Sequence, residues 1–145
     1  MDYAGDISPR DAWALLSENP KAVLIDVRTT AEWAYVGVPV LSGSGGPMRK
    51  GLHQEWQTFP TMQVDPNFVA VLSQTLAQEG LGAEDPLLFL CRSGVRSLHA
   101  ARAMTMKGYN RCWNIAGGFE GDPDHEGHRG TVNGWKADGL PWRQG

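Results

Sequence analysis

The chain has few cysteines, no long apolar run and no excess of basic residues. Its 145 residues include 2 cysteines, too few for a disulfide scaffold or a four-thiolate zinc site. The longest apolar runs, residues 22–25 and 86–91, are far too short to cross a bilayer. With 13 Lys and Arg against 16 Asp and Glu, the net charge of −3 argues against a globally basic nucleic-acid binder. We therefore expect neither a membrane nor a nucleic acid as partner.

No basic stretch followed by an apolar segment opens the chain, so we expect no secretory signal and a cytoplasmic location. In that reducing compartment a thiol stays free to react. The content of 41% hydrophobic and 20% charged residues is typical of a folded globular protein. The length predicts one domain over residues 1–145.

Helix-like and strand-like segments alternate along the chain, which indicates an α/β architecture. Continuous apolar runs predict buried strands at residues 23–27 and 86–91, and residues 111–115 are a third strand candidate. Helices are predicted from Pro9, capped by Ser8, to Asn19; from Asp65-Pro66 to Gly80; and from the segment after Cys91 to Lys107. A short helix follows Thr29.

Residues 37–64 are rich in glycine and proline and lack periodicity, so they predict a long surface excursion. Segments of that length often line a binding site. We expect Trp56 and Phe59 to pin this excursion to the core. The tail that carries Trp135 and Trp142 is expected to pack against the core.

Cys91 stands where a buried strand meets a helix, followed by Arg92-Ser93-Gly94-Val95-Arg96-Ser97. In open α/β sheets, ligands bind beyond the carboxyl ends of the strands. A loop of this kind turns backbone N–H groups inward, with Gly94 permitting the required conformation, and the next helix adds the positive end of its dipole. Both effects favour a thiolate, which is the nucleophilic form of cysteine. Cys91 is therefore the candidate catalytic residue.

The charge distribution supports this hypothesis. The segment from Cys91 to Cys112 holds five of the chain's 13 basic residues and none of its 16 acidic ones: Arg92, Arg96, Arg102, Lys107 and Arg111. A net-acidic chain thus gathers positive charge around one cysteine, which favours an anionic substrate. A buried packing cysteine with ordinary helix-surface arginines is the structural alternative.

Three stretches resemble the rhodanese-type single-domain sulfurtransferases. The first is Leu24-Ile25-Asp26-Val27-Arg28 with Glu32-Trp33 and Val36-Gly37. The second is the loop Cys91 to Ser97. The third is Asn114-Ile115-Ala116-Gly117-Gly118-Phe119 with Trp135 and the terminal Gly139-Leu140-Pro141-Trp142. Their order and spacing make the resemblance specific, and it covers most of the chain.

The resemblance implies a central, mostly parallel sheet of about five strands with helices on both faces. It also implies a persulfide cycle, in which Cys91 takes sulfur from an anionic donor such as thiosulfate and passes it to cyanide or a cellular thiol. The loop amides would hold the sulfur, Arg92 and Arg96 would pair with the donor's oxygens, and Ser93 and Ser97 would donate hydrogen bonds to it. Gly94 and Val95 complete the substrate-binding loop, and no metal or organic cofactor is needed.

Two alternatives remain. One is a sulfur-relay module that docks an acceptor protein and turns over little thiosulfate. The other is phosphatase or arsenate reductase chemistry, because related proteins of this fold carry an arginine six residues after the cysteine. In this chain the sixth residue after Cys91 is Ser97, and the arginine, Arg96, is the fifth. Sulfur transfer is therefore favoured over phosphatase or arsenate reductase chemistry.

Other polar residues are assigned structural roles. Asp26 and Arg28 end a strand, where most charges organise loops; Arg28 is expected to pair with Glu32 or with loop carbonyls, and Asp26 to cap the next turn. Cys112 is expected to be a core thiol, with a disulfide to Cys91 as the alternative.

The segment 122–133 begins like an EF-hand loop but ends in Asn133 instead of glutamate, so it is interpreted as a polar surface loop. Its two histidines, three residues apart, are too few for a zinc site. His99 follows the cysteine loop, and helical geometry leaves open whether it faces the sulfur.

Overall fold

The computed structural model describes residues 2–41, 51–58 and 60–144. A five-stranded parallel sheet with the strand order β1-β8-β7-β2-β4 forms its centre. The sheet strands are β1 (Gly5–Ile7), β2 (Val23–Asp26), β4 (Leu52–His53), β7 (Leu87–Leu90) and β8 (Cys112–Ile115). Two short antiparallel pairs join β3 (Val38–Pro39) to β9 (Trp142–Arg143) and β5 (Gln57–Thr58) to β6 (Gln63–Val64). The helices are α1 (Pro9–Glu18), α2 (Thr30–Tyr35), α3 (Phe68–Gln78) and α4 (Val95–Lys107).

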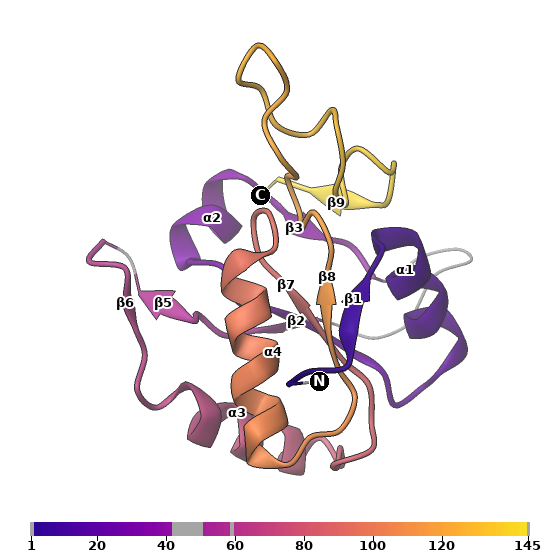
Figure 1. Cartoon of the computed structure of the whole chain (residues 1–145), viewed down its shortest axis with the longest axis vertical. Coiled ribbons are helices and arrows are strands. Elements are labelled where there is room, and N and C mark those ends of the chain that lie inside the picture. The colour runs from indigo at the N-terminus through magenta and orange to yellow at the C-terminus, as the bar shows by residue number, and fades with distance from the viewer. Residues whose placement is uncertain (1, 42–50, 59, 145) are drawn as a thin grey trace.

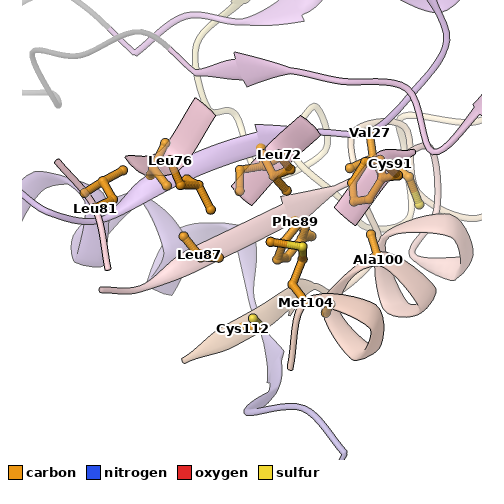
Figure 2. Packing of buried hydrophobic residues seen from close by; sticks show 14 residues of the cluster. Val27, Leu72, Leu76, Leu81, Leu87, Phe89, Cys91, Ala100, Met104 and Cys112 are labelled. Carbon is orange, nitrogen blue, oxygen red and sulfur yellow. The ribbon is translucent and has the colours of Figure 1, made fainter. Parts of the chain in front are cut away.

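Both faces of the sheet are covered, which explains why its central strands are mostly apolar. Alternate residues of β2 and β7 pack against α3 and α4 in one core; Figure 2 shows Leu72 and Leu76 of α3 with Ala100 and Met104 of α4 in this layer. The intervening residues pack against α1 and the tail in a second core, which includes Leu16 and Trp135. This arrangement confirms the expected α/β fold with helices on both faces.

The predicted caps hold at α1 and fail at α3. Ser8 Oγ accepts the N–H of Asp11 at 3.1 Å, and Pro9 opens α1 as expected. The helix α3 begins at Phe68, later than the Asp65-Pro66 start predicted above, because Asp65 forms a turn before it. In that turn Asp65 Oδ1 accepts the N–H of Asn67, and the carbonyl of Asp65 accepts the N–H of Phe68.

The excursion over residues 37–64 is more ordered than predicted. Leu52 and His53 pair with Ile25 and Asp26 and form the fifth strand of the sheet. Trp56 packs edge-to-face on Phe68 with ring centroids 4.9 Å apart, which confirms its anchoring role. Phe59 and residues 42–50 lie outside the described residues.

The tail packs against the core through Trp135, which is fully buried, while Trp142 stays partly exposed. The segment after β8 extends beyond the carboxyl end of the sheet, where the first turn of α4 also lies (Figure 1). Within residues 2–41, 51–58 and 60–144, no helix has the length and apolar character that a bilayer span requires.

Candidate functional site

Cys91 follows β7 directly, and its side chain faces the first turn of α4. The backbone N–H of Gly94 donates to Cys91 Sγ at 3.1 Å, and Ser97 Oγ lies 3.1 Å from the same sulfur. Gly94 adopts φ +111° as the N-cap of α4, a conformation that a side chain would oppose. We expected several backbone N–H groups of the loop to face the sulfur. Among the described residues, the Gly94 N–H is the backbone donor that contacts it. That donor and the helix N-terminus both favour negative charge on Sγ.

Cys91 is 1% exposed, yet it lines a cavity of about 630 Å³. Loop residues Arg92, Ser93, Val95 and Arg96 line this cavity together with Cys91. Residues from four other segments complete the lining: Glu32, Val36, Gln57, Met62, Glu120 and Arg129. A small molecule in this cavity therefore lies beside Cys91.

A buried polar chain continues from the sulfur through Ser97 to Asn114 of β8. Ser97 Oγ donates to Asn114 Oδ1 at 2.5 Å. Asn114 Nδ2 donates to a carboxylate oxygen of Asp6 at 3.1 Å and to the carbonyl of Gly94 at 3.2 Å. Because both of those partners are acceptors, the amide nitrogen must face them and the amide oxygen must face Ser97. The Ser97 hydroxyl therefore donates its proton to Asn114, and its oxygen faces Cys91 Sγ.

Parallel pairing explains why these polar residues meet. Asn114 pairs with Asp6 on one side and with Phe89 on the other, two residues before Cys91. Paired positions on neighbouring strands point to the same face, so Asn114 and Cys91 share the face that α4 covers. Sequence reasoning missed Asn114 and Asp6 as site residues, although the convergence of parallel strand ends offered a signal.

Arg96 is held by Glu32 of α2. Its two terminal nitrogens lie 2.6 and 2.9 Å from the two carboxylate oxygens of Glu32. Thr29 caps α2 and joins Glu32 in a capping box, which fixes the carboxylate in place. Burial alone would raise the pKa of Glu32. The hydrogen bonds and positive charge of Arg96, together with the hydrogen bonds from Thr29, outweigh this effect and lower the pKa of Glu32. The guanidinium expected to bind a donor is therefore already bidentately paired.

Arg28 pairs with Asp26 and with a loop carbonyl, not with Glu32. Its guanidinium lies 2.7 Å from Asp26 Oδ2 and 2.8 Å from the carbonyl of Gly37. Both side chains of the pair are buried, and the guanidinium stacks over the Phe119 ring. Asp26 Oδ1 also accepts the N–H of Arg28, which forms the expected turn. These residues tie the end of β2 to the segment that follows α2.

The glycine pair after β8 lets the next segment lie directly on the cysteine loop. Phe119 N–H donates to the carbonyl of Cys91 at 2.8 Å, and Glu120 N–H to that of Arg92 at 3.0 Å. Gly118 has φ +63°, and a Cβ there would lie 2.5 Å from the carbonyl oxygen of Cys91. Only glycine fits this close approach.

Two other candidates, Cys112 and His99, lie away from the site. Cys112 pairs with Leu87, four residues along β7 from Cys91, so the two cysteines are separated by about 13 Å of strand. A disulfide requires Cα atoms within about 7 Å. Burial raises the pKa of Cys112 to about 11, as a core thiol requires. His99 lies exposed on α4.

The loop over residues 122–133 is organised by its own side chains. Asp124 accepts the backbone N–H groups of Glu126 and His128 and the hydroxyl of Thr131. The described part of the chain contains no group of three or more His, Cys, Asp or Glu residues able to hold a metal. The EF-hand-like start of this loop therefore serves turn formation.

Comparison with known proteins supports the resemblance. A family model described as the rhodanese-like domain matches residues 8–122. An uncharacterized protein of Rickettsia rickettsii, a homologue of RP600, is 35% identical over 138 residues, which cover 95% of this chain and 96% of that protein. The thiosulfate sulfurtransferase GlpE of Actinobacillus pleuropneumoniae is 24% identical over 136 residues, 94% of this chain and 90% of the relative.

Solved structures give the same result for the fold. The crystal structure of Rv0390 from M. tuberculosis is 49% identical, with a TM-score of 0.84 and 99% of both chains covered. The solution structure of a polysulfide-sulfur transferase homodimer from Wolinella succinogenes is 24% identical, with a TM-score of 0.58; the match covers 99% of this chain and 80% of that one. The latter similarity concerns the fold alone.

Proposed function

Because this chain belongs to the family of rhodanese-like domains, we propose that it is a sulfurtransferase that carries sulfane sulfur as a persulfide on Cys91. One observation carries the proposal. The sulfur of Cys91 receives the Gly94 N–H at 3.1 Å at the start of α4 and borders a cavity lined by arginines. A nucleophilic sulfur, a donor that favours its anionic form and a cavity for an anion are what the reaction requires.

The cycle balances without a cofactor. The Cys91 thiolate attacks the outer sulfur of thiosulfate, the S–S bond of thiosulfate breaks, and sulfite leaves with its electron pair. Cys91 then carries a persulfide whose terminal sulfur is negative and lies at the N-terminus of α4, where dipole and amide stabilise it. Cyanide or a thiolate attacks that terminal sulfur and restores the Cys91 thiolate.

Arg92 is the arginine of the cysteine loop that we assign to the donor's oxygens, because Glu32 occupies Arg96. Arg96 then acts as a positioning residue that ties the loop to α2. Ser93 lines the cavity and supplies a hydroxyl to the same anion. Gly94 supplies the backbone N–H that contacts the sulfur, and Ser97 supplies the hydroxyl beside it. Val95 forms part of the apolar rim of the cavity.

The first experiment compares Cys91→Ala with Cys112→Ala, a matched control in the core. Thiosulfate:cyanide turnover should vanish in Cys91→Ala and persist in Cys112→Ala. Arg92→Ala should raise KM for thiosulfate. Mass spectrometry after exposure to thiosulfate should show the mass of one extra sulfur atom on Cys91. A protein that accepts no sulfur from thiosulfate, polysulfide or a protein persulfide would refute the proposal.

A protein acceptor is the second candidate, favoured by the apolar rim of the cavity. Val95 is 63% exposed and Met62 37% exposed, and both line the cavity. A persulfide formed from a protein donor, with negligible thiosulfate turnover, would identify this sulfur-relay role. Hydrolysis of an aryl phosphate that depends on Cys91 would instead indicate phosphatase chemistry, which the paired Arg96 and the serine at the sixth position disfavour.

A further inference from the structure

The loop between β8 and the tail brings a third arginine, Arg129, to the cavity of Cys91. We infer that Arg129 is a specificity-determining residue that binds, together with Arg92, the charged end of an anionic sulfur donor. This inference rests on the proposed sulfur transfer for the identity of the donor.

The charges around the cavity leave two arginines available. Within the described residues, Arg96 is paired with Glu32, and no carboxylate lies within ion-pair distance of Arg92 or Arg129. Glu120 also lines the cavity. With the Arg96–Glu32 pair neutral overall, the side chains of Arg92, Arg129 and Glu120 give the lining a net charge of one positive unit. An anion is thus favoured over a neutral molecule of the same size.

Arg129 is placed by contacts of its own loop. One terminal nitrogen donates to the carbonyl of Gly121 at 2.6 Å, and Gly121 N–H donates to the carbonyl of Arg92 at 3.1 Å. Gly130 N–H donates to the carbonyl of Glu120 at 2.7 Å, which holds the chain on the other side of Arg129. One carbonyl occupies only one of the five N–H donors of the guanidinium. The side chain is therefore oriented before a ligand binds and retains donors for it, which reduces the entropy lost on binding.

This position assigns a role to the loop over residues 122–133. Asp124 fixes the turn that precedes Arg129 through three hydrogen bonds, to the backbone of Glu126 and His128 and to the side chain of Thr131. The carboxylate that resembles a calcium ligand in the sequence thus shapes the segment that carries an anion-binding residue.

The experiment compares alkylation of Cys91 by iodoacetate, an anion, with alkylation by iodoacetamide, its neutral analogue, at low ionic strength. In Arg129→Gln the ratio of the two rates should fall by about tenfold or more, the effect of one hydrogen bond between charged groups. The iodoacetamide rate itself should stay within about twofold, since Arg129 does not contact the sulfur. Arg129→Lys should restore much of the ratio.

Arg111→Gln is the matched control, because it removes the same charge from an exposed position before β8, at the opposite end of the sheet. Its ratio should equal that of the unaltered protein. An unchanged ratio in Arg129→Gln, or an equal fall in Arg111→Gln, would overturn the inference. Equal losses in Arg129→Gln and Arg129→Lys, with lowered melting temperatures, would assign Arg129 a purely structural role and overturn it as well.

Turnover separates this inference from the proposed function. If both hold, Arg129→Gln raises KM for thiosulfate about tenfold and changes kcat less, because a charged contact to the bound donor is lost. If the alkylation ratio falls as expected but no sulfur reaches Cys91 from any donor, the anion-binding role of Arg129 stands and the proposed function fails.

Discussion

Replacing Asn114 with alanine should raise the reactivity of Cys91 while it destabilises the fold. The Ser97 hydroxyl donates its proton to Asn114 Oδ1. The Asn114 side-chain amide cannot flip, because Asp6 and the Gly94 carbonyl accept hydrogen bonds from its nitrogen. When Cys91 ionises, the Ser97 hydroxyl turns to the thiolate only by giving up its bond to Asn114. Asn114→Ala removes that competition.

The magnitude follows from the bonds exchanged. A neutral hydrogen bond contributes about 1 kcal/mol and one to a charged group about 1.5–3 kcal/mol. Without Asn114 the thiolate gains the Ser97 bond without loss of a Ser97–Asn114 bond, so ionisation is favoured, relative to the unaltered protein, by about 1 kcal/mol, or about fivefold in thiolate. Loss of the bonds to Asp6 and Gly94 should lower the free energy of unfolding by about 2–4 kcal/mol.

The assay is the rate of Cys91 alkylation by iodoacetamide near neutral pH, with urea unfolding measured on the same protein. Asn114→Asp should slow alkylation, since its carboxylate keeps the acceptor for Ser97 and adds negative charge near the sulfur. Asn110→Ala is the control: it loses a bond to the Glu84 carboxylate on the surface and should leave the rate unchanged. Equal or slower alkylation in a folded Asn114→Ala protein would refute the reasoning.

Two further predictions concern the contacts that hold the cysteine loop. Gly118→Ala should abolish sulfur transfer and lower stability by about 3 kcal/mol or more, because its Cβ meets the backbone of Cys91, whereas Gly127→Ala, at φ +81° with nothing within 4 Å, should cost only about 1–2 kcal/mol. Equal losses of activity in both would contradict this explanation. Glu32→Gln should lower the free energy of unfolding at pH 7 by about 2 kcal/mol, since it breaks the pair with Arg96. The pKa of Glu32 lies below its usual value of 4.5, so the unaltered protein has this stabilisation above about pH 4.5 and loses it as the pH falls through the lowered pKa. A difference between the two proteins that persists at pH 2 would show that the ion pair is not its source.

Local signals in the sequence were sufficient for most elements of the fold. Continuous apolar runs predicted β2 and β7, because a strand covered on both faces is mostly apolar, and a shorter apolar-rich segment predicted β8. The Ser8 cap with Pro9 predicted the start of α1 for an equally local reason. β4 was missed, since a strand of two residues has no periodicity and forms only where the edge of β2 accepts it.

The sequence by itself determined that Cys91 lies at the carboxyl end of a buried strand, before a helix and among basic residues, because strand and helix signals are local and charge can be counted. Only the tertiary structure decided which partner each charged group has. Arg96 forms its ion pair with Glu32, which lies 64 residues away in the chain, and the side chain of Asn114 faces Ser97. The tertiary structure also brought Arg129 from a polar loop to the cavity. These assignments depend on which strand ends and loops meet in space, and sequence spacing carries no record of distances across the sheet.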